Sequence, residues 1–162
     1  GNVVDGEIIK YANVELEDMK EVAIKSIKNN EAVWFGCDVG KMFHRDVGVM
    51  DMDLYDYEIL LGTDFLMDKG KRLEYGDSLM THAMLFTGVD IVKGKSTKWR
   101  VENSWGTKGG SKGYYLMTDK WFDEYNYEVV VDRKYLPKRL LELFKRVPVA
   151  LDPWDPMGSL AK

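Results

Sequence analysis

Residues 80–106 read MTHAMLFTGVDIVKGKSTKWRVENSWG, and they carry the clearest strand signal in the chain. The segment Met80 to Val92 is mostly apolar, and Trp99 to Trp105 alternates between apolar and polar residues. The polar residues Lys93 to Ser96 between them are typical of a turn. The two segments are therefore predicted to pair as a β-hairpin.

Outward from this hairpin, the chain reads as a mixture of short strands and a few helices. Apolar residues recur every three or four positions from Glu15 to Asn30, which predicts an amphipathic helix. Pro137 can open a further helix, with Leu140 on its apolar face. Runs rich in β-branched and aromatic residues predict further strands at Ala32 to Gly36, Tyr114 to Met117 and Tyr127 to Val131. The fold class is therefore predicted to be α+β.

Two segments do not fit this regular pattern. Residues 41–75 show neither a strand nor a helix period, so we expect irregular structure with one helical turn near Leu54 to Leu60. Residues 147–162 contain three prolines, which exclude a long helix or a central strand. We therefore expect one domain over residues 1–146 and an extended C-terminal tail over residues 147–162.

Composition narrows the class of protein. With 162 residues, 45% of them hydrophobic and 12% aromatic, the chain is long enough for one globular core and too apolar for intrinsic disorder. Its net charge of −4 gives no general reason to expect nucleic-acid or membrane binding. The single cysteine excludes a disulfide scaffold and fits a reducing compartment. Since no signal peptide or membrane-spanning run is visible either, we expect a cytoplasmic protein with no membrane partner.

His82 and Asn103 are the first candidates for chemistry. They lie 21 residues apart (103 − 82) on the two predicted strands of the hairpin. An asparagine oxygen can accept a hydrogen bond from one imidazole nitrogen and so direct the other nitrogen towards a nucleophile. Trp105, two residues further on, would lie on the same side and shield that hydrogen bond from water. The alternatives are a core histidine bonded to a backbone carbonyl and a tryptophan that only packs.

These strings resemble a known family. Thr81 to Met84 and Glu102 to Gly106, followed by a glycine-rich loop, are similar to the histidine and asparagine motifs of papain-like cysteine peptidases. The bleomycin hydrolase branch is the more similar one, because four further strings match it. They are residues 32–40, 99–105, 127–132 and 154–162.

The family's nucleophile motif is not found. Papain-like enzymes carry a catalytic Cys in a Cys-Gly-Ser-Cys-Trp type string about 130 residues or more before the histidine. Only 81 residues precede His82, and the sole thiol, Cys37, stands 45 residues before it (82 − 37) in a different context. We therefore expect Cys37 to be a buried structural residue. The chain is expected to be the C-terminal part of a longer enzyme and to be inactive alone.

The resemblance implies a specific fold and chemistry. The fold would be the β-rich half of a papain-like enzyme, with an antiparallel, barrel-like sheet and an N-terminal helix. The activity would be thiol-dependent hydrolysis by an aminopeptidase without a cofactor, in which His82 exchanges protons and Asn103 orients it. The C-terminal tail would lie in the active-site cleft, with Ala161 and Lys162 nearest the substrate and Lys162 open to trimming.

The resemblance also implies partners. These are a peptide or aminoacyl substrate, the missing N-terminal half, and five further copies in a homohexamer. Residues 41–75 and the aromatic segment Trp121 to Tyr127 would then be buried by a neighbour or by the missing half. Some family members bind nucleic acid, for which this chain offers only the short basic cluster Lys134 to Arg139.

Two other functions remain open at this stage. The same scaffold could serve as a non-catalytic binding or assembly module. A metal site built from Cys37, His44 and His82 is a further alternative, although the close ligand spacing of a structural zinc site is absent.

Overall fold

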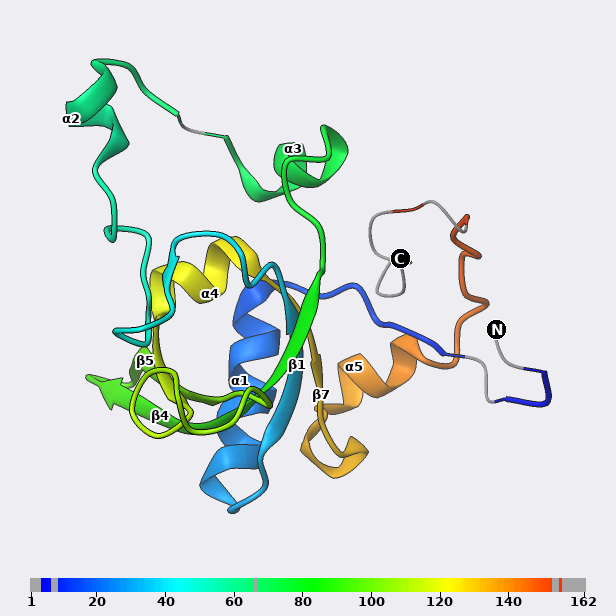
Figure 1. Ribbon diagram of the computed structural model, residues 1–162. Helices are drawn as coiled ribbons and strands as arrows, with labels where there is room; N and C mark the ends of the chain where they lie inside the picture. Colours follow the sequence, from blue (N-terminus) through cyan, green and yellow to red (C-terminus); the bar gives the residue numbers. More distant parts are fainter. Residues whose placement is uncertain (1–3, 7–8, 66, 153–154, 156–162) are drawn as a thin grey trace.

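The computed structural model describes residues 4–6, 9–65, 67–152 and 155, and in them the chain folds around one curled sheet (Figure 1). The strand order is β2-β3-β6-β5-β4-β1-β7. The strands are β1 (Val33–Cys37), β2 (Phe43–His44), β3 (Val49–Met50), β4 (His82–Val92), β5 (Lys95–Glu102), β6 (Tyr114–Thr118) and β7 (Asn126–Val130). The helices are α1 (Leu16–Lys28), α2 (Tyr57–Leu61), α3 (Lys69–Glu74), α4 (Asp119–Tyr125) and α5 (Lys138–Leu143), with a 3₁₀ turn η1 at Arg133–Tyr135. The predicted α+β class is confirmed.

The predicted β4–β5 hairpin is confirmed, and it lies at the centre of the sheet. Val92 pairs with Lys95, so Lys93 and Gly94 alone make the turn. Every strand pair is antiparallel except β3 with β6, which run parallel. The sheet is antiparallel as expected, apart from this one pair at its edge. The cause is the segment after β1, which forms the small β2–β3 hairpin and reaches β6 from the outside.

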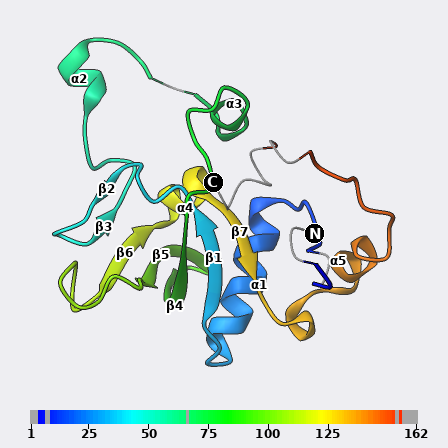
Figure 2. The same cartoon turned by 45° about the vertical axis from the view of Figure 1, so that its right-hand side comes forward.

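The core lies between one face of this sheet and the helices α1 and α4 (Figure 2). Side chains alternate between the two faces of a strand, so one face supplies the core. Phe35 and Phe86 stack with ring centroids 3.8 Å apart, and Phe122 of α4 packs on both Phe86 and Trp99. The opposite face of the sheet leaves Leu85 and Leu116 exposed.

Helix α4 is not anticipated from the sequence. Thr118 caps it, because its hydroxyl accepts a hydrogen bond from the Trp121 backbone N–H. Trp121 and Phe122 are fully buried by the chain itself. The expectation that residues 121–127 are covered by a neighbour is therefore wrong. The aromatic run resembles a strand in composition, but its buried positions 121, 122 and 125 follow a helical period.

The segment between β1 and β4 is more regular than predicted. It contains two short strands and the helices α2 and α3, of which α2 includes most of the expected helical turn. Helix α2 stands away from the sheet in Figures 1 and 2, and its apolar residues Ile59, Leu60 and Leu61 are exposed. Aspartates cap both helices, Asp56 for α2 and Asp68 for α3.

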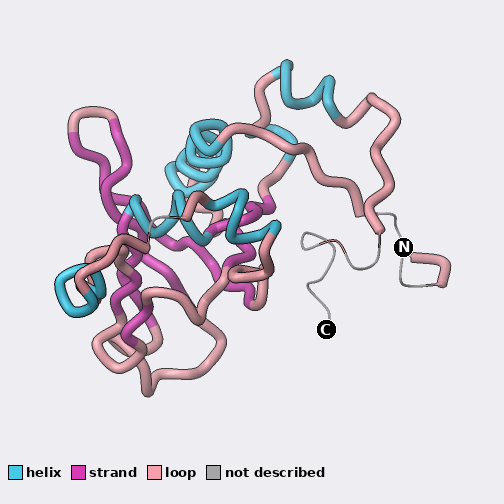
Figure 3. The backbone as a smooth tube through the Cα atoms, turned by 90° about the horizontal axis from the view of Figure 1, so that it is seen from above, coloured by secondary structure: helices cyan, strands magenta, loops and turns pink. Residues whose placement is uncertain are grey.

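The described residues before α1 and after α5 are drawn as loops in Figure 3. Helix α5 follows Pro137 as predicted. Residues 147–152 form no regular element, and Val147 and Val149 are almost fully exposed. The domain boundary at residue 146 stays a prediction. Ala161 and Lys162 lie outside the described residues. In the described part of the chain no helix combines the length and apolarity needed to span a bilayer.

Candidate active site

His82 and Asn103 meet at one end of the central hairpin. His82 is the first residue of β4, and Asn103 directly follows the last residue of β5. His82 Nε2 lies 3.0 Å from Asn103 Oδ1. Because an amide oxygen can only accept, Nε2 carries the proton and donates it. The ring is then the tautomer in which Nδ1 is free to accept a proton from a reacting group.

Asn103 is itself held in place by its neighbours. It is 8% exposed, and its backbone N–H donates to the Gly113 carbonyl at 3.3 Å. Its side-chain oxygen also accepts from the Ser104 backbone N–H at 2.8 Å. The orientation of the His82 ring is therefore set by a side chain that is anchored on two sides.

Trp105, two residues after Asn103, packs beside His82. Its ring centroid lies 4.8 Å from that of His82, at an interplanar angle of 33°. Trp105 is 37% exposed, so it packs on the His82 ring from the surface and is not a core residue. Arg45, which the sequence does not single out, lies over the same ring.

The chain leading into His82 is fixed by a second residue that the sequence does not reveal. Asp38 is buried directly after β1 and accepts hydrogen bonds from Ser78 Oγ at 2.8 Å and Thr81 Oγ1 at 3.3 Å. Ser78 Oγ also lies 2.6 Å from the Tyr127 hydroxyl. An aspartate after a buried strand is a weak signal that could have pointed to this role. Its effect is to lock the residues before β4, and so the start of that strand.

Cys37 lies directly opposite His82 in the β1–β4 register. The sequence separation of the two residues therefore does not keep them apart. What separates their chemistry is burial, since Cys37 is fully buried. Burial, together with the charge of Asp38, raises the pKa of the Cys37 thiol well above its ordinary value. The thiolate that a nucleophile requires is thus disfavoured.

The alternative metal site is not formed. His44 lies on β2 at one edge of the sheet, whereas β1 with Cys37 lies next to the opposite edge. Within the described ranges, no three His, Cys, Asp or Glu side chains come together as metal ligands.

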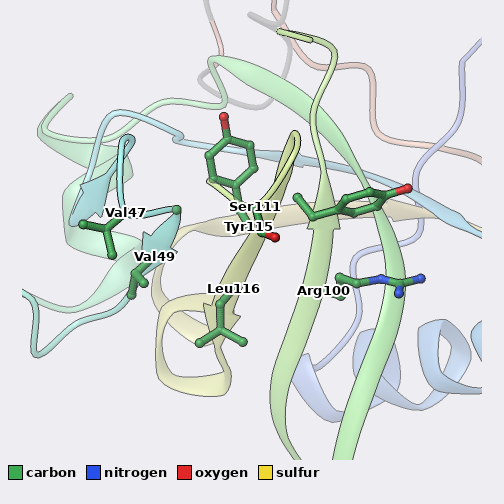
Figure 4. A pocket seen from close by; sticks show the side chains of 8 residues that line it. Val47, Val49, Arg100, Ser111, Tyr115 and Leu116 are labelled. Carbon is green, nitrogen blue, oxygen red and sulfur yellow. The ribbon is translucent and has the colours of Figure 1, made fainter. Parts of the chain in front are cut away.

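A shallow hollow of about 410 Å³ lies elsewhere, between β3, β5 and β6 (Figure 4). Arg100 and Leu116 line it, and these residues alternate with the buried Trp99, Val101 and Met117. The hollow is therefore on the outer sheet face. His82 is on the same face as the buried Met84 and Phe86, so the hollow is not part of the His82 site.

The chain is similar to proteins of a known family. Residues 1–158 match the profile of the Peptidase C1-like family. The chain belongs to this family. It is 49% identical to aminopeptidase C of Listeria monocytogenes and 52% identical to human bleomycin hydrolase, over 99% of its own length in both cases. The crystal structure of PepW from Lactobacillus rhamnosis is 51% identical and superimposes on 99% of the chain with a TM-score of 0.96.

The resemblance to this peptidase family predicted from the sequence is confirmed, and so is the bleomycin hydrolase branch. The chain spans 36% of the length of the aminopeptidase C and bleomycin hydrolase relatives, and 37% of the PepW chain.

Proposed function

We propose that this chain is the histidine- and asparagine-bearing part of a cysteine aminopeptidase of the bleomycin hydrolase type. The observation that carries the proposal is the 3.0 Å contact between His82 Nε2 and Asn103 Oδ1, with the Trp105 ring packed beside His82. Together these groups make an imidazole of fixed tautomer with one nitrogen left for proton transfer. That is the part that a Cys-His-Asn hydrolase needs besides its thiol.

The nucleophile is proposed to come from a segment outside this chain. His82 Nδ1 would take the proton of that cysteine and form a thiolate–imidazolium pair. The thiolate attacks the carbonyl carbon of the scissile bond. The imidazolium then returns its proton to the leaving amine as the C–N bond breaks, which leaves a thioester. Water adds to the thioester while Nδ1 takes its proton, and breakage of the C–S bond frees the acid and restores the thiol.

Asn103 would keep the imidazole in plane with both the thiol and the leaving group during these steps. Its oxygen accepts a hydrogen bond from the Nε2–H group in both the neutral and the protonated state of the ring. This hydrogen bond stabilises the protonated ring more. Trp105 keeps water from competing for that proton. The chain alone is proposed to be inactive, because its single thiol is buried and protonated at neutral pH.

The aminopeptidase specificity is proposed to come from the C-terminal tail. A terminal carboxylate in the cleft would attract the α-ammonium of the substrate and block longer chains, with Ala161 and Lys162 nearest to it. Deletion of residues 159–162 from the full-length protein should allow internal peptide bonds to be cut. An unchanged product pattern would contradict this part of the proposal.

The whole protein is proposed to assemble as a homohexamer in the reducing cytoplasm. Support for assembly comes from helix α2, whose exposed Ile59, Leu60 and Leu61 would be covered by a neighbour. Nucleic-acid binding receives less support, because Lys134 and Arg139 of the basic cluster are engaged with Glu31 and Asp18. We therefore propose a peptide or aminoacyl substrate only.

The proposal is tested with the full-length protein and a fluorogenic aminoacyl amide. His82→Ala should abolish hydrolysis, and Asn103→Ala should lower kcat at least about tenfold because the ring loses its orientation. His44→Ala is the matched control, since His44 is the only other histidine of the chain and lies on β2. Full activity of His82→Ala would favour the alternative, a non-catalytic binding or assembly module.

A further inference from the structure

We propose that Arg45 is a positioning residue, which holds Trp105 against the His82–Asn103 pair. This inference rests on the proposed function. The Arg45 guanidinium carbon lies 4.3 Å from the centroid of the Trp105 ring, and the same ring is 4.8 Å from the His82 ring. One indole therefore connects a surface cation with the imidazole that transfers protons.

Trp105 needs such a contact because burial does not fix it. Its side chain follows the end of β5, where strand pairing no longer restrains the backbone, and 37% of it is exposed. A guanidinium stacked on an indole is among the stronger cation–π pairs. The stack with Arg45 thus supplies a restraint that the hydrophobic core does not.

Arg45 can provide this restraint because its own backbone is fastened to the loop that follows Trp105. The Gly110 N–H donates to the Arg45 carbonyl at 3.3 Å, and the Leu116 N–H donates to the Gly48 carbonyl at 2.8 Å. Gly48 and Gly110 also touch directly, since a Cβ at Gly48 would come within 2.5 Å of Gly110 Cα. The β2–β3 turn and the glycine-rich loop are therefore held against each other.

The consequence falls on the proton-transfer steps. Without Arg45, Trp105 can leave the His82–Asn103 hydrogen bond, and water can compete for the Nε2 proton. The imidazole then spends less time in the reactive orientation. Arg45 and Trp105 support the catalytic geometry but do not touch the reacting atoms. The loss should therefore appear in kcat and not in KM.

The experiment compares three variants of the full-length protein. Arg45→Met removes the charge and the planar guanidinium but keeps an unbranched side chain, and it should lower kcat about threefold with KM unchanged. Arg45→Lys retains a cation and should recover most of that loss. Lys108→Met is the matched control, because Lys108 is an exposed cation of the same loop, whereas Arg45 is the cation that lies over the Trp105 ring.

Each result has a defined meaning. Wild-type kcat in Arg45→Met, or an equal loss in Lys108→Met, would overturn the role of Arg45. If His82→Ala also remains active, the proposed function itself fails, whereas an inactive His82→Ala beside a normal Arg45→Met removes this inference alone.

A second measurement does not depend on catalysis. The chain has two histidines, so the Nε2 proton of His82 can be followed by nitrogen-15 NMR. Its exchange with solvent should be faster in Arg45→Met than in the wild type, while the backbone spectrum shows that the fold is retained. Equal exchange in both proteins would contradict the proposal.

Discussion

At the scale of single residues, Cys37 and His82 show that a cysteine and a histidine on adjacent strands do not by themselves make a catalytic pair. They are register partners across β1 and β4, yet one side chain is sealed in the core and the other stands at its rim. Burial raises the pKa of the Cys37 thiol, so the imidazole has no thiolate to pair with.

This predicts that Cys37 can be replaced without loss of chemistry. In the full-length protein, Cys37→Ala should keep kcat within about twofold and lower the free energy of unfolding by about 1–2 kcal/mol, because a small cavity forms in the core. Kinetics and urea unfolding measure the two effects. In the native chain, Cys37 should react with a thiol reagent only as fast as the protein unfolds. Rapid labelling, or loss of hydrolysis in Cys37→Ala, would contradict this view.

The candidate pair could be predicted from sequence because it depends on local pairing. A hairpin signal, a histidine at its start and an asparagine at its end are enough to bring His82 and Asn103 together. Arg45 and Asp38 could not be found in this way. Their contacts depend on the β2–β3 turn meeting the glycine-rich loop and on residues 78–81 meeting the end of β1, and neither contact has a periodic signature.

At the scale of elements, the loop between β5 and β6 transmits backbone geometry to the site. Gly113 has φ of +89°, and a Cβ there would lie 2.6 Å from the Gly106 carbonyl oxygen. Its own carbonyl accepts the Asn103 N–H. A change at Gly113 therefore strains the loop and displaces the residue that orients His82.

Gly113→Ala should consequently lose both stability and activity. We expect the free energy of unfolding to fall by about 2–3 kcal/mol, and kcat of the full-length protein to fall with it. The control is Gly76→Ala, because Gly76 also has positive φ, +71°, but a Cβ there meets nothing within 4 Å. Gly76→Ala should lower the free energy of unfolding by about 1 kcal/mol and leave kcat unchanged. Equal losses in the two variants would show that strain alone matters.

Helix α3 carries a lysine whose burial gives a pH signature. The Lys69 ammonium donates to the Asn126 carbonyl and lies 5.0 Å from the Tyr127 ring centroid. Burial lowers its pKa from 10.5 to about 8. Between pH 8 and 10.5 the unfolded chain therefore binds more protons than the folded one, so the free energy of unfolding rises with pH over that window.

Lys69→Met should lack this rise. Relative to the variant, the wild type should gain about 1–2 kcal/mol of stability between pH 7.5 and 9.5, as measured by urea unfolding at both values. Lys71→Met is the control on the same helix, because the Lys71 side chain is 63% exposed. Its pH dependence should match the wild type. A parallel pH dependence of Lys69→Met and wild type would mean that Lys69 is charged at all of these values.

The elements themselves were predictable to different degrees. The hairpin, α1 and α5 carry strong periodic signals, and a proline marks the start of α5, so each could be predicted, although β5 begins at Lys95 and not at Trp99. Helix α4 was missed because its aromatic residues favour a strand locally, whereas packing against Trp99 and Phe86 makes it a helix. The strands β2 and β3 are two residues each, too short to show alternation.

At the scale of the whole molecule, one face of the sheet is buried by helices and the other is exposed to solvent. The inner face is covered by α1 and α4. The outer face exposes Leu85 on β4, Tyr114 and Leu116 on β6 and Val130 on β7, between 36% and 55% of each residue. Glu102 and Arg100 of β5 lie between the apolar residues of β4 and β6. Exposed apolar side chains on three strands of one sheet face are typical of a surface that has a partner.

The isolated chain is therefore expected to self-associate through this face. Leu116→Lys places a charge on this face and should shift the chain towards monomer in sedimentation velocity experiments, because pairing two such faces would then bury an unpaired ammonium. Val147→Lys is the control, since Val147 is 93% exposed on a loop away from the sheet.

Ile59→Lys tests the other exposed apolar surface, helix α2, in the same way. If only Ile59→Lys dissociates the chain, α2 is the contact. A wild-type chain that stays monomeric at high concentration would contradict both, because the hydrophobic gain from pairing the outer faces would then be too small to offset the loss of translational and rotational freedom.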